Sequence, residues 1–221
     1  MLSRVLHFIS TNKIGVEIGG PSSTGQELYK NAATIDNIIF SKNTIWSSHS
    51  DQYNYYPGKT GKVIVNDAVN LVDVPDESYD FVFSSHSLEH IANPLKAVGE
   101  WLRVVKKEGF IIIIVPEKSV CFDHKRNYST FPTLLSQYEK DVGEDDLSTL
   151  PEILAKHDLS MDPAAGNLDQ FTRRSLDNIN NRCLHHYVYD DTLLAEICQF
   201  FGGNIVYKET NGLNRWFIFK K

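Results

Sequence analysis

Cysteine is scarce in this sequence, and the few cysteines form no recognisable set. Only three occur in 221 residues, at positions 121, 183 and 198, and no two of them make a C-x-x-C pair. An odd number of widely spaced cysteines is a poor basis for a disulfide framework. The composition therefore favours a reducing compartment, and we expect a cytoplasmic protein.

Long apolar segments are lacking as well. The longest apolar run, residues 110–115, is far shorter than the roughly 20 residues that cross a membrane. The first residues do not combine a long apolar core with small residues at a cleavage site, so we expect no secretion signal. Nothing in the sequence predicts association with a membrane.

Positive charge is the third deficit, because 22 Lys and Arg stand against 28 Asp and Glu, a formal net charge of −6. A nucleic-acid partner favours a basic face, so the charge disfavours a nucleic-acid partner without excluding one. The hydrophobic content of 42% is ordinary for a globular protein. The length suits a single domain over residues 1–221 that carries an insertion, and we expect a monomer or a homodimer.

What the sequence does contain is a regular alternation of helix-like and strand-like stretches. Residues 2–10 place apolar side chains at i, i+3, i+4 and i+7, which predicts an amphipathic helix. Strands are expected at 14–18, 35–40, 63–65, 79–83 and 110–115, helices at 26–30, 94–105 and 190–201, and a closing hairpin at 204–208 and 215–219. The segment 106–109, K-K-E-G, should end the helix before it. This alternation predicts an α/β fold around a parallel sheet.

The loop after the first strand is the first functional signal. Gly19 and Gly20 follow the strand directly, and without Cβ atoms they let the backbone bend and approach a ligand closely. Glu17 places a carboxylate just before the bend. At this position in an alternating β/α chain, the pattern predicts a nucleotide-cofactor loop. A nicotinamide dehydrogenase is disfavoured, because the dinucleotide fingerprint would need glycine where Pro21 stands.

Further candidates follow the next two strands. Asp36 lies in the second strand, near the place where such folds grip ribose hydroxyls. Asp67 and Ala68 directly follow the third strand. Residues 41–62 read as irregular, with His49 and a Pro57-Gly58 turn, and this segment either covers the site or merely connects two strands.

Several motifs at matching spacing resemble the class I S-adenosylmethionine-dependent methyltransferases. An acid two residues before Gly19 is similar to their motif I. The run Y-D-F-V-F at 79–83, then L-E-H-I at 88–91 and K-K-E-G before an apolar strand, resembles the small-molecule, methyltransferase type 11-like branch. Residues 13–118 look like the cofactor half of such an enzyme. The whole chain is most similar to uncharacterised bacterial members with E-I-G-G-P-S, here at 17–22, F-D-H-K-R, here at 122–126, and a paired histidine, here at 185–186.

The resemblance implies a Rossmann-like three-layer sandwich with a seven-stranded, mostly parallel sheet and an antiparallel last strand. It also implies S-adenosylmethionine as the cofactor. Asp67 would accept a hydrogen bond from the adenine amino group, and the Ala68 amide would face the ring. The full set of expected cofactor-binding residues is Glu17, Gly19, Gly20, Pro21, Asp36, Asp67, Ala68, Ser84 and Ser85.

Residues 117–187 exceed the usual connection between the fifth strand and the last helix. So long a stretch seldom lacks structure in a compact domain, and helical patterns occur at 150–157 and at 168–183, the second with Asn167 as its N-cap. We therefore expect a helical insertion that covers the substrate site.

Histidines at the carboxyl edge of the sheet are the candidate general bases, because imidazole titrates near neutral pH. The expected catalytic residues are His86, His124, His185 and His186. Next to His124, the side chains of Asp123, Lys125 and Arg126 are candidates for binding an anionic or sugar-phosphate substrate. We expect no metal, although Asp123, His124 and one of the paired histidines form an alternative ligand set. For His90 we expect a structural role.

The expected reaction is methyl transfer to a small molecule, with a hydroxyl of a sugar or of a glycan or natural-product precursor as the acceptor. A nitrogen acceptor stays open, since an amine needs less help from a base. A non-catalytic S-adenosylmethionine-binding protein of the same fold is the alternative from another class. A DNA amino-methyltransferase is disfavoured, because residues 84–87 read S-S-H-S where [DN]-P-P-[FY] would stand.

Overall fold

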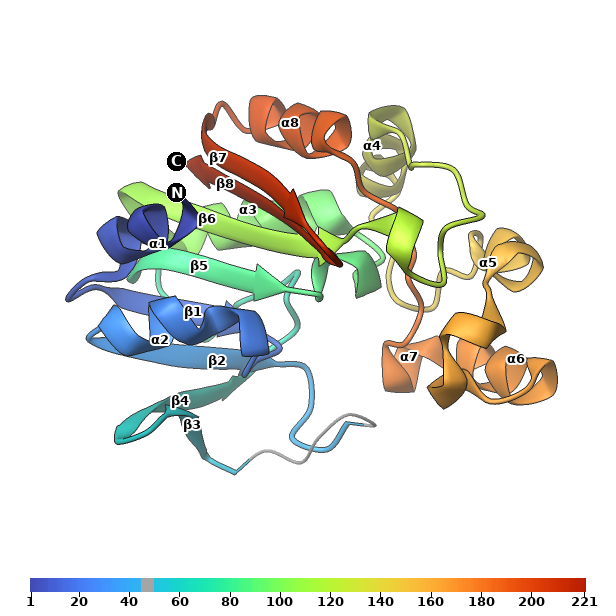
Figure 1. Cartoon of the computed structure of the whole chain (residues 1–221), viewed down its shortest axis with the longest axis horizontal. Coiled ribbons are helices and arrows are strands. Elements are labelled where there is room, and N and C mark those ends of the chain that lie inside the picture. Colours follow the sequence, from blue (N-terminus) through green and yellow to red (C-terminus); the bar gives the residue numbers. More distant parts are fainter. Residues whose placement is uncertain (45–49) are drawn as a thin grey trace.

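A computed structural model describes residues 1–44 and 50–221 of the chain. His49 lies outside the described residues. It belongs to residues 41–62, which were expected either to cover the site or to connect two strands. The described chain forms three layers, with a twisted sheet between two sets of helices (Figure 1).

The sheet has eight strands in the order β3-β4-β2-β1-β5-β6-β8-β7. In chain order the strands are β1 (Ile14–Ile18), β2 (Thr34–Ile39), β3 (Gln52–Tyr56), β4 (Lys59–Val65), β5 (Tyr79–Ser85), β6 (Val105–Pro116), β7 (Asn204–Asn211) and β8 (Asn214–Lys220). Strands β4, β2, β1, β5 and β6 are parallel, and β8 is antiparallel to both β6 and β7. The Rossmann-like α/β prediction and its antiparallel closing hairpin are confirmed.

The sheet has one strand more than the seven predicted. The extra strand, β3, lies in the stretch that was expected to be irregular, and it pairs antiparallel with β4. Tyr53 and Tyr55 point into the core while Gln52 and Asn54 are exposed, so this stretch does carry a strand period of two. Gly58, at φ +73°, makes the turn between the two strands.

Each face of the sheet buries its own set of apolar side chains. Helices α1 (Leu2–Ser10) and α2 (Gln26–Asn31) pack on one face, against residues such as Phe81 and Ile112. Helices α3 (Pro94–Val104) and α8 (Asp191–Phe200) pack on the other, against residues such as Val82 and Ile113. Neighbouring residues of β5 and β6 alternate between the two cores because successive side chains of a strand point to opposite faces.

The junction between α3 and β6 differs from the prediction. The helix ends at Val104, and residues 105–109 are already extended, with an irregular register opposite β5. Glu108, not Gly109, takes the left-handed conformation, at φ +66°. Gly109 instead lies against the backbone of Asp80, where a Cβ atom would be only 2.7 Å from the carbonyl oxygen. The glycine therefore permits close strand packing and does not cap the helix.

Residues 117–187 are largely helical, with α4 (Phe131–Glu139), α5 (Leu150–Lys156), α6 (Leu168–Leu176) and α7 (Asn178–Asn181). Asn167 caps α6 as predicted, in a capping box with Gln170. The predicted helix over 168–183 is divided at Asp177, and α4 was not predicted. A small core of Leu150, Ile153, Ala165, Phe171 and Leu184 holds the segment together. Helices α5, α6 and α7 lie beyond the carboxyl ends of the parallel strands (Figure 1).

Among the described residues, no helix is both long enough and apolar enough to cross a membrane.

Candidate active site

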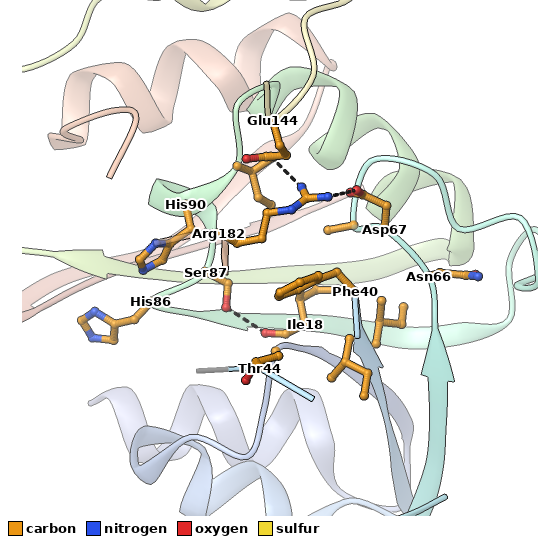
Figure 2. A pocket seen from close by; sticks show the side chains of 15 residues that line it. Ile18, Phe40, Thr44, Asn66, Asp67, His86, Ser87, His90, Glu144 and Arg182 are labelled. Atoms are coloured by element: carbon orange, nitrogen blue, oxygen red, sulfur yellow. Dashed lines mark hydrogen bonds and ion pairs between the residues drawn. The ribbon is translucent and has the colours of Figure 1, made fainter. Parts of the chain in front are cut away.

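A cavity of about 390 Å³ lies at the carboxyl edge of the sheet, where β1, β2, β4 and β5 end. Figure 2 shows the side chains that line it, with His86 and His90 on one side of the view and Asn66 and Asp67 on the other. Much of its wall between these ends is apolar. The lining residues are Ile18, Gly19, Ile38, Ile39, Phe40, Thr44, Asn66, Asp67, Ala68, His86, Ser87, His90, Ile91, Glu144 and Arg182.

The glycine loop forms part of this wall. Gly19 has φ +78°, and its N–H donates to the Ile38 carbonyl oxygen at 2.8 Å. The buried Asn37 side chain holds Gly20 from both sides: its Oδ1 accepts from the Gly20 N–H at 3.0 Å, and its Nδ2 donates to the Gly20 carbonyl at 2.9 Å. Pro21 continues the loop away from the cavity lining. Asn37 was not among the residues expected from the sequence, although a polar residue in a buried strand is a detectable signal.

Glu17 lies beneath the loop, outside the cavity lining. Its buried carboxylate accepts hydrogen bonds from the Tyr29 hydroxyl at 2.8 and 2.9 Å, from the Ser22 N–H at 3.1 Å and from the Tyr53 hydroxyl. Burial raises the pKa of Glu17 to about 7, and the three donors offset only part of that effect. A Cβ atom on Gly20 would collide with this carboxylate. Glu17 therefore supports the loop from the side opposite the cavity.

At the end of the cavity away from His86 and His90, Asp67 and Ala68 follow β4 as expected. Asp67 accepts a hydrogen bond from the Val69 N–H at 3.2 Å and forms an ion pair with Arg182 at 3.0 Å. Arg182 also pairs with Glu144 at 3.1 Å, and its guanidinium lies 5.2 Å from the centre of the Phe40 ring. Figure 2 shows Arg182 reaching between Glu144 and Asp67. Residues 117–187 thus contribute Glu144 and Arg182 to the cavity wall, and neither was expected there from the sequence.

Asp36, Ser84 and Ser85 lie outside the lining. Asp36 accepts hydrogen bonds from the Lys62 N–H at 2.8 Å and from the Tyr79 hydroxyl at 2.9 Å. Both oxygens of its carboxylate are therefore hydrogen-bonded to residues of neighbouring strands. Ser84 is fully buried. Ser85 bonds to the hydroxyls of Ser22 and Thr24, each at 2.9 Å, on the α2 side of the sheet.

The histidine end of the cavity is built by the turn after β5. His86 takes φ +51°, its Nε2 contacts Asn214 Oδ1 at 2.8 Å, and its Nδ1 lies 3.5 Å from Glu89. Burial lowers the pKa of His86, but the Glu89 carboxylate outweighs it and the net pKa is raised. His90 is in the short 3₁₀ turn Leu88–His90, and burial, aided by the nearby His185, lowers its pKa to about 4. His90 is therefore a neutral imidazole at pH 7.

His185 stands behind His90, with the two rings edge to face at 4.6 Å. Its Nδ1 lies 2.6 Å from Asp123, whose other oxygen accepts from the buried Arg126 at 3.0 Å. Arg126 also donates to the backbone carbonyls of His185, at 2.7 Å, and His186, at 3.0 Å. Although burial opposes it, His185 and Arg126 lower the pKa of Asp123 to about 2. Asp123 and Arg126 thus hold His185 in place from inside the protein.

The remaining candidates lie away from the cavity lining. His124 and Lys125 both pair with Asp158, at 2.9 and 2.8 Å. His186 is buried beside Glu144, at 3.3 Å, and its backbone N–H donates to the Glu89 carbonyl at 2.8 Å. Of the four predicted catalytic histidines, only His86 lines the cavity.

Residues 19–113 match the family described as "Methyltransferase domain". The matched segment contains Gly19, Asp67, His86 and His90, and hence every part of the cavity wall except Ile18, Glu144 and Arg182. No curated protein matches the chain.

Solved structures show the same fold over the whole chain. An S-adenosylmethionine-dependent methyltransferase from Mesorhizobium loti is 10% identical, with a TM-score of 0.57, and the match covers 100% of this chain and 96% of that one. One from Methanosarcina mazei is 12% identical, with a TM-score of 0.53 and coverage of 98% and 96%. One from Aquifex aeolicus is 14% identical, with a TM-score of 0.52 and coverage of 98% and 87%. At these identities the likeness concerns the fold.

Proposed function

We propose that the chain transfers a methyl group from S-adenosylmethionine to a hydroxyl of a small molecule, such as a sugar or a glycan or natural-product precursor. The observation that carries this proposal is the cavity itself. It joins a side-chain-free backbone at Gly19, a carboxylate at Asp67 and an imidazole at His86 within one wall of the methyltransferase domain.

The lining suits this cofactor in shape and chemistry. Gly19 lets backbone lie directly against the ligand. Asp67 keeps acceptor capacity beyond its bonds to Val69 and Arg182, because a carboxylate offers about four lone-pair positions. Asp67 and Ala68 would hold the adenine, and the apolar wall of Ile18, Ile38 and Phe40 would exclude water from the space between the ends.

S-Adenosylmethionine supplies a methyl group that is already activated by a positively charged sulfur, so the protein's main tasks are alignment and proton removal. Alignment falls to the cavity and to its cap. Arg182 and Glu144 in the wall support the role of residues 117–187 as a cap over the substrate site.

Proton removal from the acceptor hydroxyl is the role that we assign to His86. Asn214 fixes the ring through Nε2, which leaves Nδ1 on the side of Glu89. A proton taken at Nδ1 would be stabilised by that carboxylate. His86 also lies at the end of the cavity opposite Asp67 (Figure 2), where an acceptor would meet the far end of the cofactor.

The test has two stages on the full chain. Calorimetry should detect binding of S-adenosylmethionine and of S-adenosylhomocysteine, and absence of both signals would overturn the proposal. Transfer of a labelled methyl group is then measured across a panel of sugars, other alcohols and amines. Transfer to alcohols is the expected result. Transfer to amines alone would replace the hydroxyl assignment, and binding without any transfer would favour a non-catalytic binding protein.

A further inference from the structure

We propose that Glu89, His90 and His185 bind a divalent transition-metal ion at the histidine end of the cavity. One ligand atom from each of these side chains lies within 4.8 Å of the other two. Glu89 and His90 belong to the turn after β5, whereas His185 follows the insertion, so only the folded chain brings the three together. This set differs from the ligand set considered from the sequence, in which His124 would take part.

The Glu89 carboxylate is the first argument for a cation. The side chain is 1% exposed, and within the described residues neither of its oxygens accepts a hydrogen bond. Its nearest basic contact is His86 Nδ1, at 3.5 Å. A buried carboxylate without donors is costly, and a bound cation satisfies both its charge and its lone pairs.

The orientation of His185 is the second, independent argument. Its Nδ1 is engaged by Asp123 at 2.6 Å, which leaves the Nε2 lone pair available as a ligand. Metal-binding histidines usually donate their other ring N–H to a carboxylate, which fixes the tautomer and the ring. Arg126 anchors this carboxylate at 3.0 Å and also holds the His185 backbone carbonyl at 2.7 Å. The arrangement is therefore a built carboxylate–histidine pair.

The donor set indicates the class of ion. Two imidazoles and one carboxylate suit Zn²⁺ and other first-row transition ions better than Mg²⁺ or Ca²⁺, which prefer oxygen ligands. Metal–ligand bonds of about 2.1 Å place tetrahedral ligands roughly 3.4 Å apart, so the three side chains would move inward by small rotamer changes.

The location gives the ion a role in the reaction. His90 lines the cavity, and three protein ligands leave at least one position open for an oxygen of the acceptor. An ion there would orient a hydroxyl and make it more acidic. This role depends on the proposed function, whereas binding of the ion does not.

The test is calorimetric titration of the full chain, freed of metal by dialysis, with Zn²⁺ and separately with Mg²⁺. We expect one Zn²⁺ per chain and no comparable Mg²⁺ binding. Glu89→Gln and His185→Gln should each weaken Zn²⁺ binding at least tenfold, and Asp123→Asn should weaken it 10- to 100-fold. His7→Gln, on the exposed face of α1, is the matched control and should bind as the wild type does.

Two further measurements keep the outcome unambiguous. Circular dichroism and thermal unfolding establish that each variant is folded, and Co²⁺ absorption reports whether imidazole and carboxylate ligands surround the ion. Failure of the wild type to bind Zn²⁺, or equal binding by the Glu89 and His185 variants, would overturn the site. A chain that binds S-adenosylhomocysteine but no Zn²⁺ refutes only the metal site, and the reverse refutes only the proposed function.

Discussion

The two ends of the cavity are built in different ways. Gly19 and the Asp67 end come from turns that directly follow strands within residues 19–113, and short-range backbone geometry forms most of this part of the wall. Other parts of the site depend on residues far apart in sequence: Arg182 reaches Asp67 across 115 positions, and His185, which lies behind His90, reaches Asp123 across 62. Both the proposed cofactor end, at Asp67, and the proposed acceptor end, at His86 and His90, thus lie in the segment that matches the family. Residues 117–187 add Arg182 and Glu144 to the wall beside Asp67 and help to position His185 behind His90.

Replacement of His86 by Ala tests the acceptor end most severely. We expect turnover to fall 10²- to 10⁴-fold because the proton acceptor is lost, while the affinity for S-adenosylhomocysteine stays within about twofold. Steady-state kinetics and calorimetry measure the two quantities.

His124→Ala is the comparison for that variant. From the sequence alone His124 was also expected to be catalytic, but it pairs with Asp158 outside the cavity lining. A large loss of turnover in His124→Ala, with no loss in His86→Ala, would assign the role of proton acceptor to His124.

Replacement of Gly20 by Ala tests the cofactor end. The new Cβ would meet the Glu17 carboxylate and the Tyr53 hydroxyl, and we expect a loss of about 3 kcal/mol in stability together with loss of cofactor binding. Gly99→Ala in α3 is the control, because its nearest contact would be an ordinary 3.6 Å, and it should be neutral or slightly stabilising. Thermal unfolding with and without S-adenosylhomocysteine measures both stability and cofactor binding. If Gly20→Ala changed neither quantity, the loop would tolerate a side chain at this position.

The pH dependence of stability isolates Glu17 beneath the loop. Its folded pKa of about 7 lies above the ordinary value of 4.5 for a glutamate side chain, so between these pH values the folded state binds more protons than the unfolded state. Unfolding free energy should therefore fall as pH rises through this window, by at most roughly 3 kcal/mol. In Glu17→Gln, the unfolding free energy measured by urea titration should depend less on pH in this window. An unchanged pH dependence would show that a group other than Glu17 causes it.

Replacement of Arg182 by Ala should have the smallest effect, because it removes one contact between the cap and the cofactor end. The buried Glu144 would lose a partner, and we expect about 1–2 kcal/mol lower stability and a several-fold weaker affinity for S-adenosylhomocysteine. Arg173→Ala, on the exposed side of α6, is the control. Equal affinity of the two variants for S-adenosylhomocysteine would show that the contact between Arg182 and Asp67 does not contribute to cofactor binding.

The parts of the site that could be predicted are those in which a local pattern has a local cause. Gly19, Asp67 and Ala68 follow strands that apolar runs mark clearly, and they line the cavity. Asp36 was placed near the ribose position by its strand alone, but Lys62 and Tyr79 occupy its oxygens. Such a competition between partners cannot be read from one strand, because the partners come from others.

By itself, the sequence determined the alternating α/β order, the glycine loop and the turn that carries His86, because hydrophobic periodicity and glycine act over a few residues. Only the tertiary structure decided that Glu17 turns away from the cavity, that Arg182 and Glu144 enter its wall, and that Asp123 orients His185 beside Glu89. Burial and pairing of charged groups are properties of contacts between distant segments, and those contacts exist only once the insertion has packed against the sheet.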